Sequence, residues 1–161
     1  MSWLPTSKKK LEDNDYIDTV ILPRTSDIGN FEVHRALPSK DRQMVGPFIF
    51  WDQMGPGEFL SGTGLDVRPH PHIGLSTITY LFKGTMDHKD SLGNDIRIEP
   101  GDINLMSAGG GIVHSERTGQ DIRELPSELF GIQCWIAQPK KYEDSKPSFQ
   151  NICSKEITKI D

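Results

Sequence analysis

Short apolar runs alternate with polar positions along most of the chain, and turn-forming residues separate them. The 15 glycines and 11 prolines are spread out and do not form one linker. A two-residue period bounded by such residues is typical of half-buried β-strands, and no window of helical length keeps a 3.6-residue period. The pattern predicts strands at Thr19–Leu22, Phe31–Ala36, Pro47–Met54, Leu75–Phe82, Thr85–Lys89, Asp95–Ile98, Ile103–Ser107, Ile112–Arg117 and Phe130–Ile136.

These strands predict an all-β protein in which antiparallel strands close into a small β-barrel or jelly roll. Closure of this kind protects strand edges, and many short strands with little helix favour it. A length of 161 residues suits one domain. We place that domain at residues 16–138, after a polar N-terminal segment (1–15) and before a Lys-, Ser- and Pro-rich tail (139–161) without a clear period.

Net charge and cysteine content narrow the function classes. The chain carries 18 basic and 23 acidic side chains, a net charge of −5, which disfavours direct nucleic-acid binding. No apolar run approaches the roughly 20 residues of a membrane-spanning helix, and the N-terminus lacks a signal-peptide pattern. Cys134 and Cys153 lie too far apart for a CxxC motif, so we interpret them as free thiols. We expect a cytoplasmic protein.

The segment Arg68-Pro69-His70-Pro71-His72 is the strongest sign of chemistry. Residues i and i+2 of a strand point to one face, so His70 and His72 can present two imidazoles to one ion. Alone, such a pair is more often an accident of an exposed loop. A second segment after the glycines 109–111 places His114 and Glu116 on one strand face in the same way. Together the two pairs predict a metal site of three imidazoles and one carboxylate.

The spacing of these residues resembles the first motif of the cupin superfamily. Gly64, His70, His72 and Gly84 match it, and Thr77 stands where that motif has a glutamate. The glycine and histidine of the second cupin motif correspond to Gly111 and His114. The acid that is missing at position 77 is replaced by Glu116, two residues after the third histidine.

A displaced acid of this kind resembles the pirin family within the cupins, and so do further stretches from about residue 20 to 147. They are residues 44–48, 52–59, 68–84, 88–93, 100–102 and 108–117. The resemblance implies that His70, His72, His114 and Glu116 bind a metal, usually Fe(II). The same donors also accept Ni, Co, Mn, Cu or Zn. Leu105 and Gly110 depart from the pirin pattern, but neither is a ligand position.

Pirins normally contain two cupin domains and are about twice as long as this chain. Asp161 falls where a second domain would begin. We therefore expect an apolar face that a second copy covers in a homodimer. Alternatively, Phe149 and Ile152 of the tail fold back onto the domain, and the sequence does not decide between the two arrangements.

The resemblance also implies a function, ring cleavage of a flavonol-type substrate as in quercetin 2,3-dioxygenases. Glu116 would then be the catalytic base as well as a ligand, and Phe50 and Asp52 would line the pocket, although core packing explains Phe50 equally well. The alternatives are an iron-dependent, redox-responsive regulatory protein without turnover and a metal-binding domain without activity. We interpret His34 as a surface histidine and His88 as structural, with support of the ligands as the minor alternative.

Overall fold

The computed structural model describes residues 17–28 and 30–158, and almost all regular structure in these ranges is β. Two three-residue 3-10 helices, η1 (Ile122–Glu124) and η2 (Lys140–Tyr142), interrupt the strands. The strands are β1 (Arg24–Asp27), β2 (Glu32–Leu37), β3 (Phe48–Phe59), β4 (Asp66–His72), β5 (Leu75–Lys83), β6 (Met86–Asp90), β7 (Asp95–Ile98), β8 (Ile103–Ser107), β9 (Ile112–Arg117), β10 (Ser127–Ala137) and β11 (Ser148–Ile152).

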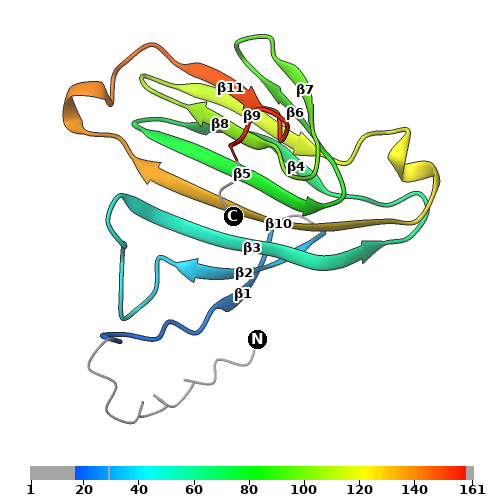
Figure 1. The fold of residues 1–161 in the computed structure, drawn as a ribbon, viewed down its shortest axis with the longest axis horizontal. Coiled ribbons are helices and arrows are strands. Elements are labelled where there is room, and N and C mark those ends of the chain that lie inside the picture. The colour runs from blue at the N-terminus through cyan, green and yellow to red at the C-terminus, as the bar shows by residue number, and fades with distance from the viewer. Residues whose placement is uncertain (1–16, 29, 159–161) are drawn as a thin grey trace.

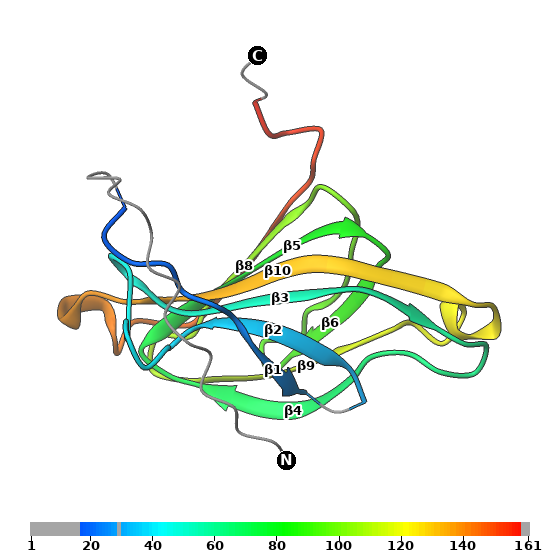
Figure 2. The same ribbon diagram turned by 90° about the horizontal axis from the view of Figure 1, so that it is seen from below.

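Two antiparallel sheets face each other (Figures 1 and 2). The larger sheet has the order β1-β2-β3-β10-β5-β8-β11, and the smaller has the order β4-β9-β6-β7. In Figure 2, β4 and β9 lie on the opposite side of the molecule from β5 and β8. The predicted all-β, cupin-type fold is confirmed.

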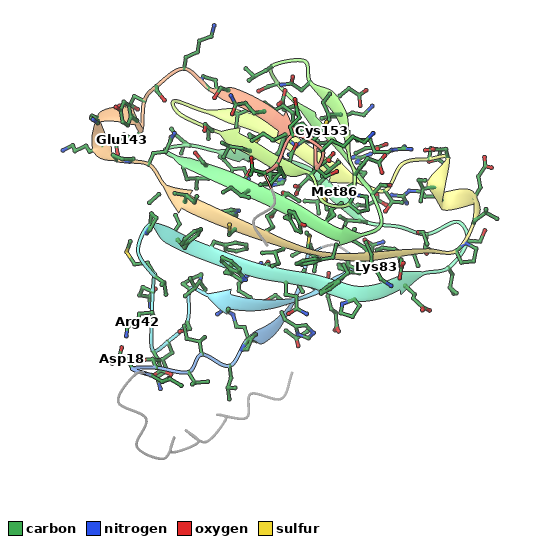
Figure 3. All side chains as sticks on the ribbon, viewed as in Figure 1. Asp18, Arg42, Lys83, Met86, Glu143 and Cys153 are labelled. Atoms are coloured by element: carbon green, nitrogen blue, oxygen red, sulfur yellow. The ribbon has the colours of Figure 1, made fainter. Side chains whose placement is uncertain are left out.

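Apolar side chains from both sheets form the main core. Met86, labelled in Figure 3, comes from the smaller sheet, and Leu81 and Leu129 come from the larger one. Burial of their apolar surface is the main favourable contribution to folding. The buried members of this core are Phe31, Val33, Met54, Phe59, Leu65, Leu81, Met86, Ile98 and Leu129.

The first strand, β1, begins later than the strand predicted at Thr19–Leu22. Residues 19–22 form no strand, because their side chains are mostly exposed and find no core to face. Instead, Arg24–Asp27 pairs with β2. An ion pair between Asp18 and Arg42 ties this N-terminal stretch to the loop before β3 (Figure 3).

Strand β3 extends beyond Met54, where the predicted strand ends, and continues through the glycine-proline segment 55–57. Gly55 has φ +66°, and a register shift between Leu129 and Gly131 of β10 accommodates the irregularity. A β-bulge absorbs an extra residue in this way without ending the pairing.

The tail contains a strand that the alternation did not reveal. Strand β11 pairs with β8, and Phe149 packs against Met106, Ala108 and Ile112. Residues 148–152 thus belong to the larger sheet, as the folding-back arrangement requires.

The predictions about the cysteines, the N-terminal segment and membrane-spanning helices concern residues that the structure describes only in part. Cys134 is buried, Cys153 is exposed, and neither forms a disulfide. The polar segment 1–15 lies outside the described residues. In the part of the chain that is described, no helix is long and apolar enough to cross a membrane.

Candidate metal centre

Strand β9 lies between β4 and β6 in the smaller sheet, and this position gathers the candidate ligands. His114 of β9 pairs with His70 on one side and with Asp90 on the other. Two pairs further along, Glu116 is opposite His88. Because alternate residues of a strand share a face, all five side chains stand on the same side of the sheet.

Three imidazoles converge where β4 and β9 meet. The ring centroids of His70, His72 and His114 are 4.4 to 5.0 Å apart. The Nε2 atoms of His72 and His114 are 3.0 Å apart. One nitrogen from each of the three rings lies within 4.8 Å of the others, which suits a shared cation.

Glu116 belongs to a second group of donors. It forms a triad with His88 and His114, again with all donor atoms within 4.8 Å of one another. The structure thus brings the three predicted histidine ligands together and places the predicted carboxylate ligand beside His114. Within the described residues it does not gather all four donors into one group of that size.

Burial keeps the rings of His72 and His114 neutral. Desolvation, with a smaller effect of the neighbouring His70, lowers the pKa of His72 to about 4. Desolvation and then the imidazoles around it lower the pKa of His114 to about 2. A neutral imidazole keeps a lone pair for a metal, so both rings are suited to act as ligands at neutral pH.

Contacts behind the rings fix their orientation. His70 Nδ1 lies 2.8 Å from the carbonyl oxygen of Arg68, to which it donates, so Nε2 of His70 carries the free lone pair. The Trp135 ring meets His72 edge-on at 5.0 Å between centroids. Such contacts commonly set the tautomer and direction of metal-binding histidines.

Glu116 is a buried carboxylate, and an amide from the larger sheet holds it. Gln133 Nε2 donates to Glu116 Oε1 at 2.7 Å and to Thr79 Oγ1 at 3.1 Å. Burial raises the pKa of Glu116, and the Gln133 hydrogen bond partly opposes this effect. The sequence reasoning missed Gln133, although a polar residue in the apolar run 130–137 was a signal for it.

A cavity of about 170 Å³ opens beside His70 and Glu116. Phe50 and Asp52 both line it, but their contacts limit what they can do. Asp52 is held by Arg35 in a bidentate ion pair with N–O distances of 2.7 and 2.8 Å. The Phe50 ring stacks on Trp135 at 4.1 Å, and the guanidinium carbon of Arg35 lies 4.3 Å from its centroid.

The chemistry of these donors fits a divalent transition metal. The Nε2 atoms of two buried imidazoles lie 3.0 Å apart, and a cation that binds both can replace the proton that they would otherwise share. A buried carboxylate with a raised pKa gains in the same way from a nearby positive charge. Imidazole with carboxylate suits iron, nickel, copper and zinc, so the donors do not select one metal.

Comparison with known proteins gives consistent matches. The profile of the family described as Pirin matches residues 30–136. A pirin-like protein of Caulobacter vibrioides is 51% identical over 135 residues, which are 83% of this chain and 46% of that protein.

Two crystal structures of quercetin 2,3-dioxygenase from Acinetobacter baumannii have similar folds. One is 42% identical with a TM-score of 0.77 and covers 81% of this chain and 43% of its own. The other is 30% identical with a TM-score of 0.76 and covers 86% of this chain and 49% of its own.

The chain spans about half the length of the curated relatives it matches. The family match covers the strands that carry the three histidines, Glu116 and Gln133. Fold, motif spacing and sequence similarity agree, and the chain therefore belongs to the pirin family.

Proposed function

We propose that this domain is the metal-binding part of an Fe(II)-dependent dioxygenase that cleaves flavonol-type aromatic substrates. The observation that carries the proposal is the cavity beside three convergent imidazoles and a buried carboxylate of raised pKa. The relatives named as quercetin 2,3-dioxygenases support the reaction class.

The size and lining of the cavity suit one ring of such a substrate. An apolar cavity of about 150 Å³ is large enough to bind benzene, so about 170 Å³ accommodates the ring that reacts. Leu65, Val67 and Met86 supply apolar walls. Because Arg35 neutralises Asp52, the carboxylate in the wall does not repel electron-rich oxygen groups.

In the proposed reaction, Glu116 accepts a proton from the substrate. Its raised pKa makes it a stronger base than an exposed carboxylate, and it lines the cavity in which a substrate hydroxyl would lie. Gln133 holds the oxygen Oε1 in one orientation, which leaves Oε2 for the transfer. A metal bound by the histidines supplies a Lewis acid and a template for a substrate with adjacent oxygens.

Aerobic incubation of the iron-loaded chain with quercetin tests the proposal. We expect loss of flavonol absorbance together with release of carbon monoxide, and loss of both in His114→Ala and Glu116→Ala. Tyr142→Ala, at an exposed position that does not line the cavity, is the control that keeps turnover. Metal-loaded protein that leaves quercetin intact would refute the assigned substrate.

Metal analysis of protein purified without added metal tests the second part of the proposal. We expect iron at a stoichiometry of one ion per chain. If nickel, cobalt, manganese, copper or zinc were found at that stoichiometry, the proposed metal site would stand and the assignment of iron would be wrong.

A further inference from the structure

A row of hydrogen-bonded side chains extends from the candidate metal centre into the smaller sheet. His114 Nδ1 lies 3.4 Å from His88 Nδ1, and His88 Nε2 lies 3.1 Å from Asp90 Oδ2. The side chains of His88 and Asp90 are 1% and 0% exposed. No step of the proposed reaction uses either residue. The sequence pattern favours a structural role for His88, with support of the metal ligands as the minor alternative.

The end of the row at Asp90 fixes the direction of donation. Asp90 Oδ1 accepts from the backbone amides of Leu92 and Asn94 and from the Asn94 side chain, and Oδ2 accepts from Asn94 as well. A carboxylate held by so many donors is an acceptor only. His88 must therefore carry its proton on Nε2, the nitrogen that faces Asp90.

The direction of donation at Asp90 also determines which nitrogen of His114, the candidate metal ligand, carries a proton. A neutral His88 with its proton on Nε2 has a lone pair on Nδ1. His114 Nδ1 faces that lone pair and is therefore the donor, so the proton of His114 sits on Nδ1. His114 Nε2, which faces His72 at 3.0 Å, is left with a lone pair directed at the candidate metal position.

The tail strand shields the row from water. The Phe149 ring of β11 stacks on His88 with centroids 4.4 Å apart and an interplanar angle of 22°. On the other side, the imidazoles of His88 and His114 are 5.1 Å apart. A water molecule that competed for the ring nitrogens would let either tautomer form, and this packing leaves little room for one.

We propose that Asp90 and His88 are positioning residues that set the tautomer of His114 and thereby direct its Nε2 to the metal. The proposal rests on the metal centre of the proposed function, and it is independent of substrate and turnover. Outer partners of this kind typically contribute about 10- to 100-fold to metal affinity.

The Asp90→Asn variant separates positioning from packing. The two backbone amides hold an acceptor oxygen at the Oδ1 position, so the new amide nitrogen faces His88 Nε2. That nitrogen donates, which moves the His88 proton to Nδ1 and the His114 proton to Nε2, where it blocks coordination. Asp87→Asn is the matched control, since Asp87 lies on the same strand but pairs with Arg97 on the other face.

Two measurements on the full chain decide the matter. Long-range nitrogen-15 NMR of metal-free protein reports which nitrogen of each ring is protonated, and Co(II) titration reports the affinity. We expect Nδ1–H on His114 and Nε2–H on His88 in the parent chain, reversal in Asp90→Asn, and about 10- to 100-fold weaker Co(II) binding by that variant only.

Three outcomes would overturn the proposal. The first is the opposite tautomers in the parent chain, a result that needs no variant to fold. The second is unchanged Co(II) affinity in a folded Asp90→Asn protein. The third is two Co(II) ions per chain with His88 as a ligand, which would make the His88, His114 and Glu116 triad a second metal site. Failure to cleave quercetin leaves all of these measurements unaffected.

Discussion

The three imidazoles of the candidate metal centre are each held by a different kind of neighbour. A backbone carbonyl holds His70, an aromatic edge packs against His72, and a second imidazole faces His114. Because each ring has its own support, losing one support should weaken the site without dispersing the others. The chemistry at this scale therefore depends on residues that never touch the metal.

Removal of the amide at Gln133 tests one such support. In Gln133→Leu the carboxylate of Glu116 loses a donor that stabilises its charged form, so we expect the pKa of Glu116 to rise further. We also expect about tenfold weaker Co(II) binding. Carbon-13 NMR titration of the Glu116 carboxyl and Co(II) titration measure the two effects.

Gln53→Leu is the matched control for this variant. Gln53 lies on the neighbouring strand and donates to the carbonyl of Gly55, away from Glu116. An equal loss of Co(II) affinity in both variants would mean that the Gln133 effect is only structural.

The lowered pKa values of His72 and His114 predict how acid acts on the metal-free protein. Both rings stay neutral in the folded state but take up a proton near their ordinary pKa of 6.5 when unfolded. Each adds a slope of about 1.4 kcal/mol per pH unit, so stability is lost as pH falls from about 6.5 toward 4. Glu116, whose pKa is raised, acts in the opposite direction and offsets part of the loss.

Urea unfolding of metal-free protein between pH 7 and 4 measures this slope. His72→Gln removes one of the two groups and should flatten the curve. A parent chain and variant with identical slopes would show that His72 does not remain neutral in the folded state.

At the scale of strands, a sequence pattern predicted a strand correctly only where that segment also has a neighbouring strand to pair with. Strands β7, β8 and β9 match their predicted ranges because their turns carry glycine and their alternation is clear. The first strand was misplaced because the apolar run at 19–22 pairs with no strand in the described residues, whereas the more polar Arg24–Asp27 pairs with β2. Long-range pairing of this kind leaves no local signal in the sequence.

The same reasoning explains what was found and missed at the site. Alternation alone located His70, His72, His114 and Glu116, because ligands on one strand are two residues apart. The row through His88 and Asp90 depends on β9 lying between β4 and β6, an order that the sequence does not state. Gln133 lies on the facing sheet, and its contact with Glu116 likewise depends on an arrangement of strands that the sequence does not show.

Glycine 84, between β5 and β6, tests the packing between strands. It has φ +75°, and a Cβ there would lie 2.0 Å from the carbonyl oxygen of Glu128 in the neighbouring chain segment. We expect Gly84→Ala to lower the free energy of unfolding by about 3 kcal/mol or more, since clash adds to backbone strain. Gly62→Ala, with φ +82° but open space, should lower it by only about 1 kcal/mol.

Urea unfolding of the two glycine variants separates the effects. Equal losses of unfolding free energy would mean that the left-handed backbone conformation accounts for both effects. The contact between residue 84 and the carbonyl oxygen of Glu128 would then add nothing.

Strand β11 is attached to the rest of the sheet by β8 and by the side chain of Phe149. Phe149→Ala leaves a hole beside His88, and because the ring is only half-buried we expect a loss of about 2 to 3 kcal/mol, below the range for a fully buried ring. Phe149→Leu refills most of the space and should lose about 1 kcal/mol. A loss below 0.5 kcal/mol for Phe149→Ala, measured by urea unfolding, would mean that the tail strand is loosely attached.

At the scale of the whole molecule, the metal site and the fold are coupled through the smaller sheet. The three histidines come from two paired strands, β4 and β9, whereas Gln133 reaches Glu116 from the larger sheet. The unfolded chain does not hold these groups together, so a metal that binds the folded state shifts the unfolding equilibrium of the entire domain.

This coupling predicts the thermal behaviour of the domain. Co(II) at 100 times its dissociation constant should add about 2.7 kcal/mol to the free energy of unfolding. In a domain of this size that corresponds to a rise in Tm of about 5 to 10 °C. His114→Ala should show no rise, because it removes the donor shared by both triads. Thermal scans with and without Co(II) measure the shift, and an unchanged Tm in the parent chain at saturating Co(II) would mean that the histidines hold no metal in the folded state.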